Sequence, residues 1–221
     1  MKKQISLVLT AFLLAGSLFA CSEEGNTFEA KSYTPQGVEI SGIDIQVEDR
    51  EILVAPSNDG QFHIDYAESA KEFYDISVSD SGVLTMVSKN EKEWTDYFGG
   101  SKSAGANQIT LQIPDTTLST LTLRTTQEDI SLPTLTVTDQ LVLSNNGGDI
   151  SFEHISAANA ITVENKNGDI VGTIRGSYDD YAITSTIKKG ESNLPDEKGG
   201  GDKTLTAVNN NGDIDIEFIS E

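Results

Sequence analysis

The feature that most constrains the fold is a turn that recurs at a nearly constant interval. The segments NNGGDI, NKNGDI and NNNGDI occupy residues 145–150, 165–170 and 209–214. Two weaker copies extend the series, so that acids stand at Asp129, Asp149, Asp169, Glu191 and Asp213, in steps of 20, 20, 22 and 22 residues. Internal repetition at such a period is typical of a chain that builds its core by stacking similar units.

A second sequence feature repeats at the same intervals of 20, 20, 22 and 22 residues. Short alternating segments precede the turns and begin at Leu121, Leu141, Ile161, Ile183 and Leu205. Alternation of apolar and polar residues predicts strands, and the Thr, Val and Ile in these segments favour the same structure. Asn-Gly turns also suit a meander of hairpins, but a meander does not require the same sequence at every second strand.

Equivalent residues of a coiled chain stack about 4.8 Å apart, which explains the repetition. We therefore predict an all-β fold, a parallel β-solenoid (single-stranded β-helix) of about five repeat coils over residues 114–221. The inward columns would follow chain order, as Leu121–Leu141–Ile161–Ile183–Leu205. Residues 33–113 are β-rich but do not follow the period, and we expect an irregular or antiparallel N-terminal region that caps the stack. Residues 33–221 would form one continuous domain.

The turns have a structural explanation and a functional one. Gly148, Gly168, Gly190 and Gly212 precede the acids and are expected to supply positive φ at each corner. The acids would accept hydrogen bonds from corner amides. Alternatively, the stacked carboxylates of Asp149, Asp169 and Asp213 would hold calcium, which prefers oxygen ligands. No other cofactor is expected.

The first residues predict export and a lipid anchor. Lys2 and Lys3 precede the apolar run ISLVLTAFLLAG, and the segment LFAC ends at Cys21, the single cysteine of the chain. This pattern resembles a bacterial lipoprotein signal, which implies a signal peptide at 1–20 and an acylated Cys21. Two acyl chains suffice for stable membrane attachment. The polar residues 21–32 would form a flexible tether on the exterior face of the cytoplasmic membrane, or on the outer membrane of a diderm cell.

The net charge and the lack of catalytic motifs limit the functions that the sequence supports. The formal net charge of −20 opposes binding to nucleic acid and suits a cationic partner or divalent cations. The two histidines, His63 and His154, have no spaced partner motif, and no catalytic or nucleotide-binding signature occurs. We therefore predict that the chain is not an enzyme, with a carbohydrate-active β-helix enzyme as a less favoured alternative.

Two segments interrupt the pattern. Residues 90–108 carry Trp94, Tyr97 and Phe98, which would bind a protein or a glycan, or else cover the core. Residues 188–203 are rich in Gly and charge and predict a loop.

The ordered set of segments carries a family resemblance. GIDIQVEDREILVAPSNDGQFHIDY, DSGVLTMVSK, ITLQIP and the serial NGDI turns span about residues 38–221. Together they resemble the putative-adhesin family of bacterial envelope proteins with β-strand repeats, a domain of unknown function. The resemblance implies a β-solenoid on the cell exterior and supplies no catalytic residues. The expected function is a surface-anchored, non-enzymatic binding or scaffold module, and the alternative is a calcium-stiffened structural or envelope-sensing module.

Overall fold

The computed structural model describes residues 27–91, 106–115 and 118–220, and within these ranges the chain is almost entirely β-structure. The N-terminal strands are β1 (Glu29–Tyr33), β2 (Gly42–Gln46), β3 (Glu51–Pro56), β4 (His63–Glu68), β5 (Glu72–Val78), β6 (Val83–Asn90), β7 (Gln108–Ile113), β8 (Leu118–Arg124) and β9 (Ile130–Leu132). The C-terminal strands are β10 (Leu135–Asn145), β11 (Ile150–Ala157), β12 (Ala160–Asn167), β13 (Ile170–Arg175), β14 (Tyr181–Lys189), β15 (Glu197–Lys198), β16 (Lys203–Asn211) and β17 (Ile214–Ile219). A single turn of 3-10 helix, η2 (Tyr178–Asp180), precedes β14.

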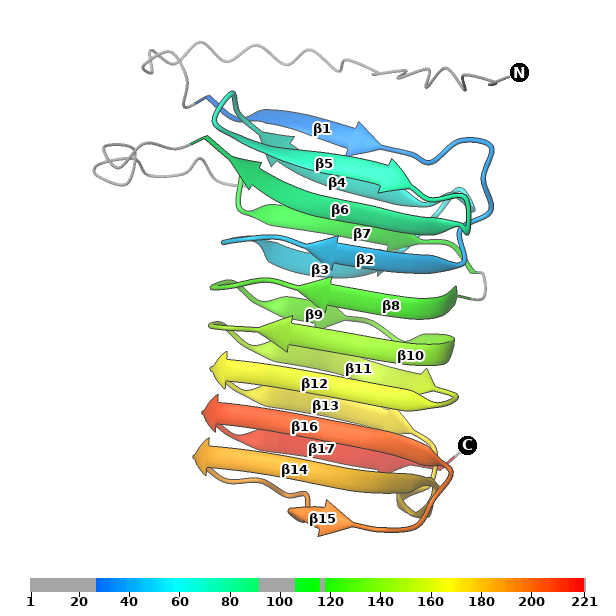
Figure 1. Cartoon of the computed structure of the whole chain (residues 1–221), viewed down its shortest axis with the longest axis vertical. Coiled ribbons are helices and arrows are strands. Elements are labelled where there is room, and N and C mark those ends of the chain that lie inside the picture. Colours follow the sequence, from blue (N-terminus) through cyan, green and yellow to red (C-terminus); the bar gives the residue numbers. More distant parts are fainter. Residues whose placement is uncertain (1–26, 92–105, 116–117, 221) are drawn as a thin grey trace.

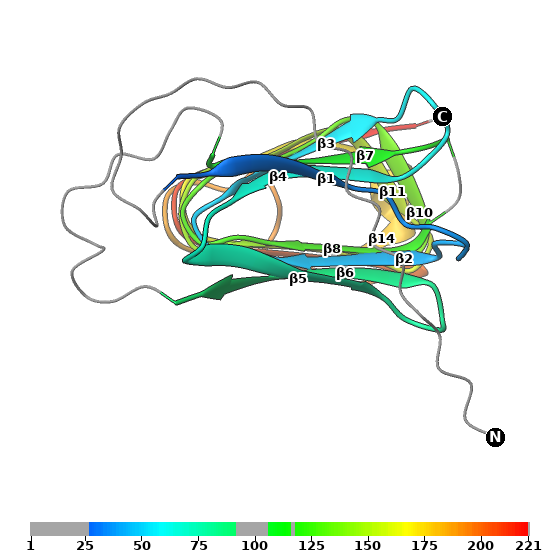
Figure 2. The same ribbon diagram turned by 90° about the horizontal axis from the view of Figure 1, so that it is seen from above.

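The strands form a stack of coils with two long walls (Figure 1). In one wall the parallel order is β6–β2–β8–β10–β12–β16–β14, and in the other it is β7–β3–β9–β11–β13–β17. Figure 2 looks along the stack and shows the two walls facing each other across a flattened interior. The predicted parallel β-solenoid is confirmed.

The predicted order of the coils is wrong at the C-terminal end. Leu205 pairs with Ile161 on one side and with Ile183 on the other, so the coil β16–β17 lies between β12–β13 and β14. The sequence period identifies which residues are equivalent, but any two equivalent coils have the same apolar column and can be neighbours. The column therefore runs Leu121–Leu141–Ile161–Leu205–Ile183.

The N-terminal region contributes more regular structure than expected. The coil β2–β3 stacks in parallel register between β6–β7 and β8–β9, which adds two coils to the predicted stack. Strands β1, β4 and β5 pair antiparallel and close this end. Strand β1 overlaps the end of the predicted tether, residues 21–32, and it is held by main-chain pairing to β4 although its sequence has no apolar alternation.

The interior is a continuous apolar column. Ile52, Ile130, Ile150, Ile170 and Ile214 stack along one wall, and each is at most 1% exposed. Their neighbours in sequence point outward, as the strand alternation predicts. Each coil thus buries its apolar side chains against those of the coils above and below it.

Residues 188–203 close the C-terminal end of the stack. The Asn193 amide nitrogen donates to the carbonyl oxygen of Ile214 at 3.1 Å, and its side-chain oxygen accepts from the amide of Ile216 at 3.1 Å. Its side-chain nitrogen donates to the carbonyl oxygen of Ile216 at 3.1 Å, so Asn193 satisfies the outer edge of β17 much as another strand would. Leu194 is 7% exposed and covers the interior. The Gly- and charge-rich segment is therefore an edge cap, which protects the stack against end-to-end association.

Candidate functional site

The corner acids form a ladder of hydrogen bonds. The Oδ1 atom of Asp129 accepts from the amide of Asp149 at 2.7 Å, and Asp149 accepts from the amide of Asp169 at 2.8 Å. Asp169 accepts from Asp213, and Asp213 accepts from Glu191, both at 2.8 Å. Each of these four aspartate carboxylates therefore satisfies a corner amide of the coil stacked next to it.

The corner asparagines and glycines complete this arrangement. The side-chain nitrogens of Asn165 and Asn209 donate to the carbonyl oxygens of Gly148 and Gly168, each at 2.9 Å. The φ angles of Gly148, Gly168, Gly190 and Gly212 are +83°, +112°, +128° and +124°. At Gly168 an added Cβ atom would lie 2.2 Å from the carbonyl oxygen of Gly148, so the stack leaves no room for a side chain there.

The acid ladder and calcium binding use the same carboxylates. Asp149, Asp169 and Asp213 each use Oδ1 for an amide, which leaves the second oxygen of each for solvent or a cation. Among the described residues, no group of three or more His, Cys, Asp or Glu side chains is arranged to hold a metal ion. Calcium binding at this column stays a prediction.

Cys21, Trp94, Tyr97 and Phe98 lie outside the described residues. Over the part of the chain that is described, no helix is long and apolar enough to cross a membrane.

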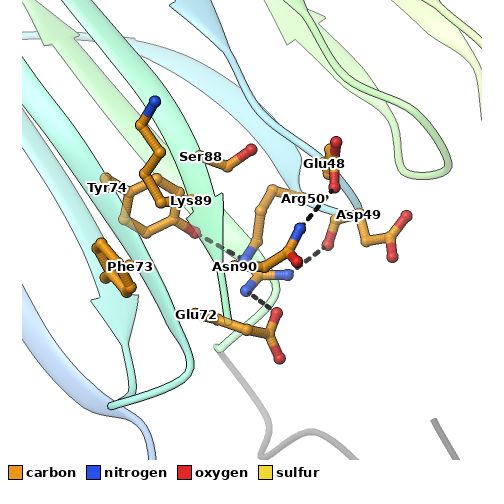
Figure 3. A pocket seen from close by; sticks show the side chains of 9 residues that line it. All are labelled: Glu48, Asp49, Arg50, Glu72, Phe73, Tyr74, Ser88, Lys89 and Asn90. Carbon is orange, nitrogen blue, oxygen red and sulfur yellow. Dashed lines mark hydrogen bonds and ion pairs between the residues drawn. The ribbon is translucent and has the colours of Figure 1, made fainter. Parts of the chain in front are cut away.

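A buried arginine, Arg50, lies in the connection between β2 and β3, and Figure 3 shows the side chains around it. Arg50 is 2% exposed; its Nε donates to the hydroxyl of Tyr74 at 2.8 Å and its Nη1 to the carbonyl oxygen of Asp49 at 2.8 Å. Its Nη2 forms an ion pair with Glu72 at 2.7 Å. Sequence reasoning missed this residue, and the only available signal was a lone arginine between two strands.

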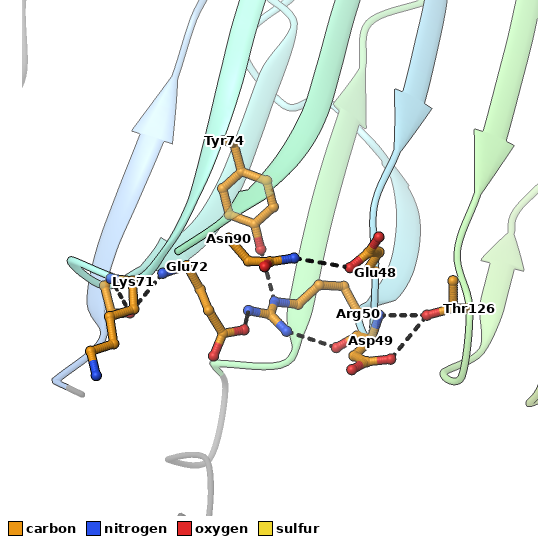
Figure 4. Close-up of polar contacts among 9 residues, drawn as sticks. Glu48, Asp49, Arg50, Lys71, Glu72, Tyr74, Asn90 and Thr126 are labelled. Atoms are coloured by element: carbon orange, nitrogen blue, oxygen red, sulfur yellow. Dashed lines mark hydrogen bonds and ion pairs between the residues drawn. The ribbon is translucent and has the colours of Figure 1, made fainter. Parts of the chain in front are cut away.

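The Arg50 side chain ties the β2–β3 connection to β5, and further hydrogen bonds lie beside it. Figure 4 shows Asn90 donating to Glu48, and the amide of Asp49 donating to Thr126, at 3.3 and 2.9 Å. Burial alone would lower the pKa of Arg50, but Tyr74 and Glu72 outweigh it and the pKa is raised. Burial raises the pKa of Tyr74, although Arg50 opposes this. The adjoining cavity has a volume of about 40 Å³, which fits water rather than a larger ligand. The cluster is therefore a structural link.

Replacement of Arg50 tests this structural role. We expect Arg50→Met to lower the free energy of unfolding by about 1–3 kcal/mol, because Glu72 and Tyr74 lose their buried partner. Arg124→Met is the control, since Arg124 has a half-exposed side chain 3.6 Å from Asp44 and should change stability by less than about 0.5 kcal/mol. Urea unfolding followed by circular dichroism measures both. Equal effects of the two substitutions would contradict the structural role.

A larger groove lies at the opposite corner of the N-terminal coils. Its volume is about 500 Å³, within the usual range of ligand pockets. Its walls come from the β1–β2 connection, the β3–β4 turn and the β7–β8 connection, and the residues that line it are Pro35, Val38, Glu39, Ile40, Gly60, Gln61, Phe62, Pro114 and Asp115.

A polar network fixes two of these walls. The hydroxyl oxygen of Thr34 lies 2.8 Å from Nδ1 of His63, and Nε2 of His63 lies 2.9 Å from Asp59. Asp59 also accepts from the hydroxyl of Ser57 and the amide of Gln61, at 2.9 and 3.0 Å. The hydrogen bonds from His63, Gln61 and Ser57 lower the pKa of Asp59 to about 2, so this carboxylate stays ionised at any physiological pH. The β3–β4 turn is thereby tied to the residue that follows β1.

Stacked parallel coils with glycine–acid corners define a β-solenoid, and comparison with known proteins identifies its family. The chain belongs to the Toastrack DUF4097 family, whose model matches residues 40–221. This confirms the resemblance inferred from the strand and turn segments.

Solved structures are similar to the chain to different degrees. One described as a putative cell adhesion protein from Clostridium sporogenes has a TM-score of 0.53 at 12% identity, over 87% of this chain and 99% of that one. A putative adhesin from Bacteroides fragilis is 14% identical over 87% of this chain and 97% of that one, with a TM-score of 0.35. None of the curated proteins compared with the chain matches it. For the Clostridium sporogenes structure, at 12% identity, the likeness concerns the fold alone.

Proposed function

We propose that the protein is a lipid-anchored, non-enzymatic binding module of a bacterial envelope, attached to the membrane through Cys21. The observation that most directly supports this proposal is the groove of about 500 Å³ near one end of the stack. The corner acids and the buried Arg50, by contrast, form hydrogen bonds that hold the fold together. The lipoprotein-like signal that ends at Cys21 supports the anchor. The family and the cell adhesion description of a structure with the same fold support an exterior location.

The stack itself suits display of a binding surface. Its coils are joined by main-chain hydrogen bonds along the full length of both walls, which gives a stiff support. A rigid support keeps the groove in one conformation, which reduces the entropy lost on binding.

Substitution of the cysteine tests the anchor. We expect Cys21→Ser to abolish incorporation of a labelled fatty acid and to leave the protein unprocessed or released, because serine has no thiol to acylate. Incorporation is measured after expression in a bacterial host, with the unchanged chain as control. Equal labelling of the two proteins would refute the anchor.

A calcium-stiffened module is the second candidate, because the column of stacked carboxylates favours it. Asp169→Asn keeps an oxygen that accepts from the amide of Asp213 and removes one charge. If the acid only satisfies the corner, we expect the melting temperature to stay nearly unchanged, or to rise at low salt through reduced repulsion. If the column binds calcium, millimolar calcium raises the melting temperature of the native protein and raises that of Asp169→Asn less. Melting with calcium, with magnesium and without added metal separates the two candidates, and we expect the first result.

A further inference from the structure

We propose that the groove binds an extended basic segment of a partner protein, in which an apolar side chain lies next to lysine or arginine. This inference rests on the proposed binding function and names the class of partner. It requires an apolar floor, unpaired acids at the rim and walls that are fixed before binding.

The floor of the groove is apolar and partly exposed. Val38 is 46% exposed, beside Phe62 and Ile40, which pack against the core of the stack. Pro35 and Pro114 complete the apolar lining, and their rings fix the backbone torsion φ at two of the three walls. An apolar side chain placed here would remove Val38 and Phe62 from water.

The rim is acidic. Glu39 comes from the β1–β2 connection and Asp115 from the β7–β8 connection, and both are exposed. Within the described residues neither carboxylate forms an ion pair, whereas the neighbouring Asp59 pairs with His63. A positive charge on each side of an apolar side chain would complement this rim, and the net charge of −20 would steer a basic segment toward it.

Hydrogen bonds hold the two walls that come from the β1–β2 connection and the β3–β4 turn. The β1–β2 connection is held at one end by the contact of Thr34 with His63, and at the other by the amide of Ser41, which donates to Gly82 at 2.9 Å. The amide of Ser57 donates to Ile113 at 2.8 Å, which joins the β3–β4 turn to β7. Such a preformed site does not have to order its own loops when the ligand binds.

The lining favours a peptide over a glycan. Among the described residues that line the groove, Phe62 is the only aromatic one, and it is partly buried, so these residues offer a sugar ring little aromatic surface on which to stack. The rim acids also disfavour phosphorylated or carboxylated polymers. An extended peptide supplies the apolar and cationic groups together.

The test measures binding of a synthetic peptide to the full chain in detergent micelles, by isothermal titration calorimetry. The probe is an extended peptide of alternating lysine and leucine, compared with one of glutamate and leucine and one of lysine and serine. We expect only the lysine–leucine peptide to bind, with an affinity that falls as salt rises.

Matched substitutions locate the binding. Val171 lies on the outer face of β13 and is also 46% exposed, so Val171→Glu is the control for Val38→Glu. We expect Val38→Glu to weaken binding about tenfold or more and Val171→Glu to leave it unchanged, since only the first buries a charge under the ligand. The double substitution of Glu39→Gln and Asp115→Asn should weaken binding about threefold and reduce the salt dependence. Circular dichroism confirms that each variant is folded.

Three outcomes would overturn the inference. They are an absence of binding by the lysine–leucine peptide, equal binding by the glutamate–leucine peptide, and equal effects of Val38→Glu and Val171→Glu. Without peptide binding, a concentration-dependent dimer that is lost in Val38→Glu would instead assign the groove to a second copy of this chain. If Cys21 carries labelled fatty acid but the peptide does not bind, the inference about the groove is rejected and the lipid anchor stands. If the peptide binds but Cys21 carries no fatty acid, only the lipid anchor is rejected.

Discussion

We expect Gly168→Val to destabilise the protein by about 3 kcal/mol or more, because two separate costs fall on one residue. Gly168 has a φ of +112°, a conformation that a β-branched residue adopts with strain. Its added Cβ would also lie 2.2 Å from the carbonyl oxygen of Gly148 in the neighbouring coil. A shift that relieved this contact would separate the coils and break the ladder from Asp149 to Asp169.

Two other glycines separate these costs. Gly60 has a φ of +75° with nothing within 4 Å of an added Cβ, so Gly60→Val carries the conformational cost alone. Gly199 has neither a positive φ nor a close neighbour, and Gly199→Val should be almost neutral. Thermal and urea unfolding of the three variants should rank Gly168→Val as the most destabilising and Gly199→Val as the least. A Gly168→Val protein as stable as Gly60→Val would show that the coils tolerate a side chain at the corner.

We expect Ile170→Ala to lower the free energy of unfolding by about 2–5 kcal/mol, since it leaves a cavity inside a closely packed column. Ile170 is fully buried and is stacked between Ile150 and Ile214, so the adjacent coils cannot close the gap without losing their main-chain register. The neighbouring Val171 is 46% exposed, and Val171→Ala should cost less than about 0.5 kcal/mol. Chemical denaturation of both variants measures the difference.

The same pair of experiments is available one coil earlier. Ile150→Ala should resemble Ile170→Ala, and Ser151→Ala should cost little because its side chain lies on the outer face. Equal losses at 150 and 151 would contradict the assigned facing of the strand.

The sequence predicts the local structure of this chain better than the order of its parts. Alternation places Leu141 and Ile150 inward because each strand position has a fixed facing. The turn period places glycines at corners for a similarly local reason. Equivalent coils present similar apolar surfaces, so the period carries no information on which coil lies beside which. Ile183 and Leu205 therefore exchanged places relative to the prediction.

The groove and the arginine cluster depend on contacts between distant segments. Thr34 and His63 come together only because β1 pairs with β4, and the sequence of β1 lacks the apolar alternation that would predict a strand. Arg50 meets Glu72 and Tyr74 because β5 extends the wall beyond β6. No spacing rule within a single segment predicts these contacts.

Strand β16 lies between β12 and β14, which are both synthesised before it, and this order has a consequence for folding on the ribosome. A nascent chain that extends only to β15 has an open edge at β12, and β14 carries the equivalent residue, Ile183, that can occupy the place of Leu205. Emergence of β16 must displace any such pairing before the native neighbours form. A stalled or cleaved chain that ends before β16 would leave β14 without its parallel partner, and its exposed strand edges would make it a target for proteases.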